Sequence, residues 1–191
     1  MSKLIEKHVC HHVRLYLENN ELLHSKQSGF RQNHSCETAL TNIIDDWITA
    51  INDKLYVGTI FLDLTKAFDL VSHSLLLNKL KLYHFSDSSI NWFTSYSTNR
   101  SQKVAISSHL SSTKDISAGV PQGSKLGPII FILYINDLTL HIGNLSIDMF
   151  ADDTTHSAYG TSIEPVYNTL QNEINATENL CQQNSMKPHI S

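Results

Sequence analysis

Apolar side chains recur every three or four residues in several stretches, which is the spacing of one face of an amphipathic α-helix. The clearest stripe follows Ser35, a residue type that commonly caps a helix start, with Glu37 in the first turn, where the helix dipole favours an acidic side chain. We expect this stripe to pack into the core; it comprises Leu40, Ile43, Ile44, Trp47, Ile48 and Ile51. The same spacing predicts helices over roughly residues 3–18, 74–84, 87–97, the stretch after Ser124, and 163–183.

Local signals place the starts of these helices. Ser72, Ser86 and Ser124 precede three of them, and Pro128 lies in the first turn after Ser124, where proline is well tolerated. Residues 161–164 (TSIE) fit a capping box. The polar stretch 19–34 is expected to be a loop, and the tail 184–191, which contains a proline, is expected to fray.

Three strand regions stand between these helices. Residues 55–63 show little alternation, which predicts a strand covered on both faces or nearly so. Residues 102–117 and 147–158 each predict a hairpin. In the second of these hairpins, Asp152 and Asp153 are expected to form the turn, because Asp tolerates turn geometry.

Carboxylates fall at the ends of two of these strands. Asp63 ends the first strand, and the pair Asp152 and Asp153 sits at the second hairpin turn. An isolated Asp-Asp pair is more often a solvated turn, but a third carboxylate in a similar position changes the interpretation. If the strands are neighbours, the three side chains meet and present the oxygen ligands that two-metal phosphoryl transfer needs. A haloacid-dehalogenase phosphatase is rejected, because its second Asp would stand where this chain has Thr65.

The loop of residues 119–124 (GVPQGS) is the second candidate for chemistry. Its two glycines permit close approach of the backbone to a ligand. Taken alone, such a loop is usually an ordinary turn.

Composition bounds the class of protein. With 191 residues, 41% hydrophobic and 17% charged, the chain is expected to fold as one globular domain over residues 1–191. The net charge of −4 counts against a nucleic-acid binder, although candidate metal ligands themselves add negative charge. Three distant cysteines favour free thiols in a reducing compartment. Without a membrane-spanning apolar run or a signal peptide, we expect an intracellular protein of cytoplasm or nucleus, not secreted and not in a membrane.

Histidines gather near the N-terminus, at His8, His11 and His12, beside Cys10. Their spacing matches no compact zinc pattern. We interpret them as surface residues of the first helix.

Several segments together resemble the reverse transcriptases of non-LTR (LINE-type) retrotransposons. Residues 61–69 (FLDLTKAFD) resemble motif A of that family, residues 119–124 with 126–128 (LGP) resemble motif B, and residues 150–153 (FADD) resemble motif C. Residues 27–31 (QSGFR) are similar to the segment ahead of motif A, and 134–138 (YINDL) to the continuation of the motif B helix. The five segments occur in the family's order and cover nearly the whole chain.

The resemblance implies an α+β fold: a polymerase palm with an antiparallel sheet backed by helices, part of the fingers, and no thumb. It assigns residues 1–54 to a helical part that connects fingers and palm, and 55–191 to the palm. The implied activity is RNA-templated DNA synthesis with two Mg²⁺ ions, or Mn²⁺ in their place. The implied partners are an RNA template, a DNA primer and deoxynucleoside triphosphates; the resemblance leaves the oligomeric state open.

Residue roles follow from the same resemblance. Asp63, Asp152 and Asp153 are the implied catalytic metal ligands, with the Leu64 carbonyl as a further ligand. Phe68 is implied as a steric gate against the ribose 2′-hydroxyl, and a plain core role is the alternative. Nucleotide contacts fall to Gln122 and Gly123, and template contacts to Arg31, Gly119 and Pro121.

Departures from the family pattern support a second hypothesis. The fingers hairpin, the lysine of motif D, the thumb and the endonuclease are not found in the sequence, Leu180 stands where the family usually has Trp, and Lys125 stands where it usually has an apolar residue. The alternative is a truncated, catalytically inactive remnant of a retroelement that acts at most as a binding or structural module.

Overall fold

The computed structural model describes residues 2–139 and 145–189. Helices and strands alternate along the chain, with a long hairpin inserted in the middle. The helices are α1 (Ser2–Asn19), α2 (Cys36–Asn52), η1 (Ala67–Leu70), α3 (His73–Leu82), α4 (Asp87–Ser97), α5 (Gly127–Tyr134), η2 (Asn136–Thr139) and α6 (Ile163–Gln183). The strands are β1 (Tyr56–Leu64), β2 (Arg100–Gln102), β3 (Ala105–Ile106), β4 (His109–Leu110), β5 (Lys114–Ile116), β6 (Ser146–Phe150), β7 (Asp153–Gly160) and β8 (Pro188–His189).

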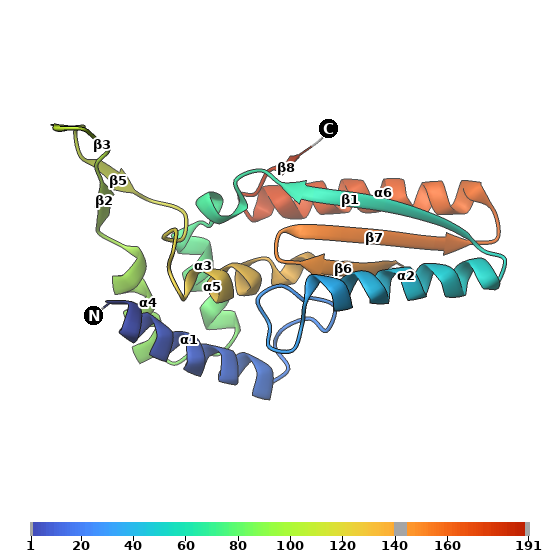
Figure 1. Ribbon diagram of the computed structural model, residues 1–191, viewed down its shortest axis with the longest axis horizontal. Coiled ribbons are helices and arrows are strands. Elements are labelled where there is room, and N and C mark those ends of the chain that lie inside the picture. Colours follow the sequence, from blue (N-terminus) through green and yellow to red (C-terminus); the bar gives the residue numbers. More distant parts are fainter. Residues whose placement is uncertain (1, 140–144, 190–191) are drawn as a thin grey trace.

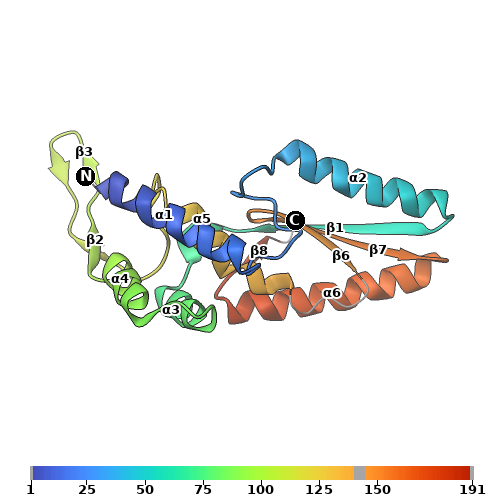
Figure 2. The ribbon, with the colours of Figure 1, turned by 90° about the horizontal axis from the view of Figure 1, so that it is seen from below.

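A four-stranded antiparallel sheet with the order β6-β7-β1-β8 forms the centre of one half of the molecule. Helix α2 covers one face of this sheet and α6 covers the other (Figures 1 and 2). The remaining helices and the β2–β5 hairpin lie toward the other end of the molecule (Figure 1). The predicted α+β architecture with an antiparallel sheet backed by helices is confirmed.

Gly58 explains how closely α6 approaches β1. A Cβ atom at Gly58 would lie 2.6 Å from Val166 and 2.7 Å from Leu170, both on α6. A side chain at this position would therefore force the Val166 and Leu170 side chains to shift.

The predicted helices form, and local caps begin three of them. Ser35, Ser72 and Ser86 accept hydrogen bonds from the first-turn amides of α2, α3 and α4. The capping box expected at the start of α6 does not form, because the Ser162 side chain makes no capping hydrogen bond there. The hairpin expected over 102–117 forms as the paired strands β2 and β5 with β3 and β4 at the tip.

The apolar stripe of α2 is less buried than predicted. Only Ala50 is fully buried, and Ile43 and Trp47 are half-buried against the sheet. Four members of the expected core stripe are exposed instead, Leu40, Ile44, Ile48 and Ile51. The apolar stripe of α2 is wider than the surface of the sheet that the helix covers. The spacing of apolar residues therefore predicted more buried residues than the helix has.

Strand β1 also differs from the prediction of two covered faces. Phe61 is 73% exposed and Tyr56 is 51% exposed, while Leu64 at the strand end is buried. The described part of the tail expected to fray is ordered, since β8 pairs Pro188 with Leu64 and His189 with Asp63. The short β8 strand therefore extends the sheet along the edge that carries Asp63. Residues 190–191 of that prediction lie outside the described residues.

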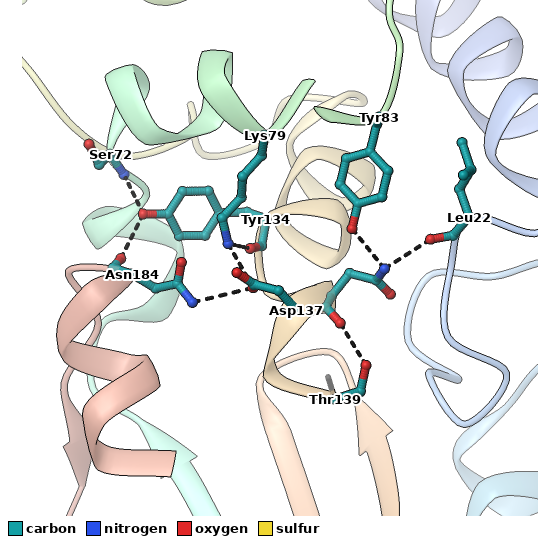
Figure 3. Close-up of polar contacts among 9 residues, drawn as sticks. Leu22, Ser72, Lys79, Tyr83, Tyr134, Asp137, Thr139 and Asn184 are labelled. Carbon is teal, nitrogen blue, oxygen red and sulfur yellow. Dashed lines mark hydrogen bonds and ion pairs between the residues drawn. The ribbon is translucent and has the colours of Figure 1, made fainter. Parts of the chain in front are cut away.

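Helix α5 is the centre of the core, with seven of its eight residues buried. A polar network surrounds its C-terminal end and joins α3, η2 and the end of α6 (Figure 3). The Tyr134 hydroxyl donates to the Asn184 carbonyl at 2.6 Å, and Lys79 donates to the Tyr134 carbonyl and to Asp137 at 2.7 Å. Asn184 donates to the same Asp137 carboxylate at 3.3 Å. These buried polar groups fix the register between helices that apolar contacts alone would leave loose.

Candidate active site

The β6–β7 hairpin ends in a two-residue turn made by Ala151 and Asp152. Phe150 pairs with Asp153 across the hairpin, so Asp153 is the first residue of β7 and lies outside the turn, contrary to the prediction that both acidic residues form it. Ala151 takes a left-handed conformation with φ 58°. Two-residue hairpin turns favour such positive φ values because they match the twist of the strands.

Antiparallel pairing brings Asp63 to this turn. Leu62 pairs with Thr154, so the register places Asp63 opposite Asp153 at the next position. Side chains alternate between the two faces of a strand. Thr59 lies on the same face of β1 as Asp63, and Ser157 lies on the same face of β7 as Asp153. Thr59 contacts Ser157, and Trp47 of α2 donates a hydrogen bond to Ser157. Asp63 and Asp153 therefore lie on the face of the sheet that carries α2.

The electrostatics of the turn agree with this placement. Burial raises the pKa of Asp152, a hydrogen bond from its own backbone amide opposes that rise, and the negative charges of Asp153 and Asp63 raise the pKa further. Like charges in one site disfavour the ionised form. The charges of Asp153 and Asp63 therefore act on the Asp152 carboxylate.

The predicted metal ligands are not assembled in the geometry of a finished metal centre in the described part of the chain. Over residues 2–139 and 145–189, no group of three or more His, Cys, Asp or Glu side chains is arranged to hold a metal ion. Asp63 and Asp153 are exposed and Asp152 is half-buried. Carboxylate oxygens are nevertheless the donors that hard divalent cations prefer, so the residues fit such an ion in chemistry.

Strand β1 ends at Leu64, one residue after the predicted end at Asp63, and the chain turns there. Leu64 is buried, with 2% of its surface exposed, and its backbone pairs with Pro188. Lys66 has a positive φ of 50° and begins η1, in which Phe68 lies. Phe68 thus returns toward the core directly after the acidic strand end.

The glycine-rich loop is fastened to this return. The Gly119 amide donates to the Val71 carbonyl at 2.8 Å, and the Val120 amide donates to the Phe68 carbonyl at 3.0 Å. Gly119 has φ 89°, and a Cβ atom there would lie 2.9 Å from the Asp69 carbonyl oxygen. Only glycine allows both this backbone conformation and this approach.

A cavity of about 290 Å³ lies between the two segments. Its lining residues are Phe68, Val120, Pro121, Gln122, Gly123, Ser124, Gly127 and Pro128. Phe68 is distant in sequence from Gln122 and Gly123, and the three residues share this cavity. Pro121, expected to contact the template, lines it as well. The nucleotide and template roles of these residues stay predictions. Gly119 lies outside it and lines an adjoining polar cavity of about 620 Å³ that also shares Pro121 and Gln122.

Arg31 does not stand free as a ligand-binding cation. Its guanidinium donates to the carbonyls of His24 at 3.1 Å and Gln27 at 3.2 Å. These bonds hold the loop between α1 and α2 in shape. The predicted template contact of Arg31 stays a prediction.

Two residues near the site escaped the sequence analysis. Glu6 of α1 accepts hydrogen bonds from the Ser124 hydroxyl at 2.8 Å and the Lys125 amide at 2.9 Å, and so anchors the glycine-rich loop. Gln27 contacts Ala151 in the hairpin turn. Neither belongs to a recognisable local pattern, although the segment containing Gln27 carried part of the family resemblance.

Comparison with known proteins decides the family. Residues 1–189 match the family model described as reverse transcriptase (RNA-dependent DNA polymerase). The chain belongs to the reverse transcriptase family. The resemblance to non-LTR retrotransposon enzymes, drawn from the sequence, is confirmed by the relatives of this domain.

Those relatives include polymerases of Drosophila mobile elements. The domain is 32% identical over 158 residues to the probable RNA-directed DNA polymerase from transposon X-element of Drosophila melanogaster, a match covering 80% of this chain and 17% of that protein. It is 29% identical over 183 residues to the RNA-directed DNA polymerase from mobile element jockey of the same species, covering 92% and 20%. The chain thus spans about a fifth of the length of these relatives.

Solved structures of telomerase share the fold of this reverse transcriptase domain. The apo telomerase of Candida tropicalis superposes with a TM-score of 0.67 and 13% identity, covering 99% of this chain and 36% of that one. Telomerase of Candida albicans in complex with a fragment of telomeric RNA superposes with a TM-score of 0.56 and 14% identity, covering 95% and 34%. At this identity the likeness concerns the fold alone.

Membrane insertion through a helix finds no support in the described residues. None of the helices there combines the length and the apolar character that a bilayer crossing requires.

Proposed function

We propose that this reverse transcriptase domain is the palm of an RNA-templated DNA polymerase of a non-LTR retrotransposon. The observation that carries the proposal is the meeting of Asp63 with the hairpin turn of Asp152 and Asp153. The names of the Drosophila relatives support RNA-directed DNA synthesis as the reaction of the parent protein.

Asp63, Asp152 and Asp153 would hold two divalent cations, with the Leu64 carbonyl as a further ligand. Mg²⁺ is the proposed ion and Mn²⁺ its substitute, because both prefer carboxylate and carbonyl oxygens. When bound, such ions lower the pKa of an attacking hydroxyl and neutralise phosphate charge. Burial and the negative charges of Asp153 and Asp63 raise the pKa of Asp152, which supports a cation beside this carboxylate.

The cavity beside Phe68 is proposed as the nucleotide site. Gln122 and Gly123 would contact the incoming deoxynucleoside triphosphate, and Phe68 would close the floor under its sugar. Gly119, Pro121 and Arg31 would lie along the RNA template that pairs with a DNA primer. The domain division into residues 1–54, connecting fingers and palm, and 55–191, the palm, belongs to the same proposal.

A second candidate is an inactive remnant that folds without catalysing synthesis. Lys125 favours it, because it is a charged residue where the family usually has an apolar one. The two candidates differ in whether the carboxylates support chemistry.

Primer extension separates the two candidates. Residues 1–191 would replace the matching segment of the jockey polymerase, so that the flanking parts of a complete enzyme surround the domain. We expect extension of a DNA primer on an RNA template in Mg²⁺, with Asp152→Asn at least about a hundredfold slower, since a metal ligand acts in the transition state. Extension that persists unchanged in Asp152→Asn would contradict the assignment, and a folded chimera without any extension would favour the remnant.

A further inference from the structure

The Gln27 side chain is the most deeply buried polar group in contact with the hairpin turn. Only 1% of its surface is exposed. Its amide oxygen accepts from the Ala151 amide at 3.0 Å, and its amide nitrogen donates to the Ala151 carbonyl at 3.3 Å. The two bonds satisfy both peptide groups of one residue, and that residue directly precedes Asp152.

The turn needs such a partner. In a two-residue turn the strand ladder ends at the flanking pair, here Phe150 and Asp153, so the backbone groups of the first turn residue have no partner in the ladder. Ala151 is buried and has a positive φ, which is unfavourable for a residue with a Cβ atom. Buried peptide groups left unpaired would favour another turn conformation.

The backbone around Gln27 is fixed to the same hairpin. The Met149 amide donates to the Lys26 carbonyl at 3.0 Å, and the Ser28 amide donates to the Met149 carbonyl at 2.8 Å. This is a short parallel bridge between the loop and β6. The Gly29 amide donates to the Gln27 side-chain oxygen at 2.7 Å, which fixes the rotamer of that side chain.

Gly29 allows the loop that contains Gln27 to lie directly against Ala151 of the hairpin turn. A Cβ atom at Gly29 would lie 2.1 Å from the Ala151 nitrogen, so no other residue allows the loop to approach the turn this closely. The loop and the turn therefore fit as one unit, far apart in sequence and held by backbone and amide contacts.

We propose that Gln27 is a positioning residue that holds the Ala151–Asp152 turn in the conformation that presents the Asp152 carboxylate. The inference deepens the proposed polymerase function and rests on it for the catalytic consequence. The effect on the turn itself does not depend on catalysis. Gln27 acts through Ala151 and has no role as a metal ligand, since its amide oxygen already accepts from the Gly29 and Ala151 amides.

The test compares Gln27→Met with Asn136→Leu. Methionine fills a similar volume but cannot replace the two hydrogen bonds to the turn. Asn136 is the matched control, because its buried amide also bonds loop backbone, accepting from His24 at 2.8 Å and donating to Leu22 at 2.9 Å. Among the described residues, its amide makes no hydrogen bond with the β6–β7 hairpin.

Hydrogen exchange of the Ala151 amide is the first readout, measured in the metal-free chain. We expect Gln27→Met to accelerate it by about tenfold or more relative to Asn136→Leu, after correction for global stability through the α5 amides. Equal exchange in the two variants would overturn the proposal. If Gln27→Met does not fold, the wild-type chain decides instead: a Gln27 side-chain amide that exchanges as fast as an exposed one would overturn the proposal.

Primer extension in the jockey chimera is the second readout. Gln27→Met should lower kcat about tenfold or more at saturating nucleotide, with the nucleotide KM changed less than about twofold, because Gln27 does not line the nucleotide cavity. The purely structural alternative predicts that kcat per folded molecule stays at the wild-type value in both variants. If the wild-type chimera fails to extend, the polymerase proposal fails, and hydrogen exchange still decides whether Gln27 holds the turn.

Discussion

The ring of Phe68 stacks on the ring of Phe131, with 4.2 Å between the centroids and 23° between the planes. Phe131 belongs to the buried helix α5. The stack therefore connects Phe68, which lies shortly after Asp63 in the sequence, to the centre of the core. Phe30 meets Phe68 edge-on with 6.1 Å between the ring centroids. The Phe68 ring is held on two sides and presents the rest of its surface to the cavity beside Gln122.

A smaller side chain at this position should relax sugar selection. Phe68→Val in the jockey chimera is expected to raise incorporation of ribonucleotides relative to deoxynucleotides by about tenfold or more, because a steric barrier is removed. The same change should lower the free energy of unfolding by roughly 1–3 kcal/mol, since part of an aromatic stack is lost.

The matched control is Phe131→Leu, which removes the stacking partner without touching the cavity. It should cost similar stability and leave the discrimination ratio unchanged. A loss of overall activity in Phe68→Val with an unchanged ratio would leave Phe68 as packing only.

Local signals in the sequence predicted much of this fold. Ser35, Ser72 and Ser86 act within one turn of their own position, so their caps are readable from sequence alone. Burial is set by what lies opposite in space, which periodicity does not report. For that reason the exposed Ile48 of α2 and the paired Pro188 of β8 both differ from expectation.

The buried contact between His156 of β7 and Glu173 of α6 should make each side chain depend on the other for stability. His156 Nδ1 lies 3.3 Å from the Glu173 carboxylate, without the alignment of a hydrogen bond, and the two side chains are only 3% and 9% exposed. Replacing either residue by Leu leaves the other buried without its partner, so each single variant is expected to lose roughly 3 kcal/mol in urea unfolding. The double variant His156→Leu with Glu173→Leu should lose at least about 1 kcal/mol less than the sum.

Asp46→Ala is the control for this pair, because Asp46 pairs with Lys26 at 3.1 Å with side chains 44% and 37% exposed. It should cost less than about 1 kcal/mol, as exposed pairs do. If the stability losses of the two single variants at His156 and Glu173 add exactly to that of the double variant, the contact between the two side chains contributes nothing to stability.

Alkaline pH should destabilise the domain through Cys181. Burial raises the pKa of this thiol to about 11, whereas a thiol in the unfolded chain ionises near pH ~8.5. The folded state keeps the proton that the unfolded state releases, so stability is complete below about pH 8.5 and falls as pH rises toward 11. The loss attributable to this group is at most about 3 kcal/mol.

Urea unfolding between about pH 8 and 10.5 measures this slope. Cys181→Ala should flatten it, although its stability at neutral pH will be lower because a buried side chain is truncated. Cys36→Ala, at an exposed thiol, should leave the slope unchanged. Identical slopes in wild type and Cys181→Ala would refute the assignment.

Two parts of the candidate site could be predicted from the sequence. These are the carboxylates near the ends of strands and the loop that contains two glycines. The pairing of β1 with β7 then places Asp63 beside Asp153, as the positions of both residues at strand ends suggested. Gln27 was not predictable, because its partners are backbone groups of Ala151 and no sequence pattern marks such a contact. The hydrogen bonds of Arg31 to the carbonyls of His24 and Gln27 were likewise not predictable, and its template contact stays a prediction.

The central claim is that Asp63 and Asp152 share a divalent cation. Electron paramagnetic resonance of Mn²⁺ tests it without requiring activity, because binding removes the signal of the free ion. Titration of Mn²⁺ into the chain should show binding in wild type and in Asp45→Asn, an exposed carboxylate on α2, and strongly weakened binding, by about tenfold or more, in Asp63→Asn and in Asp152→Asn. Equal Mn²⁺ binding by all four proteins, or none by the wild type, would contradict the account.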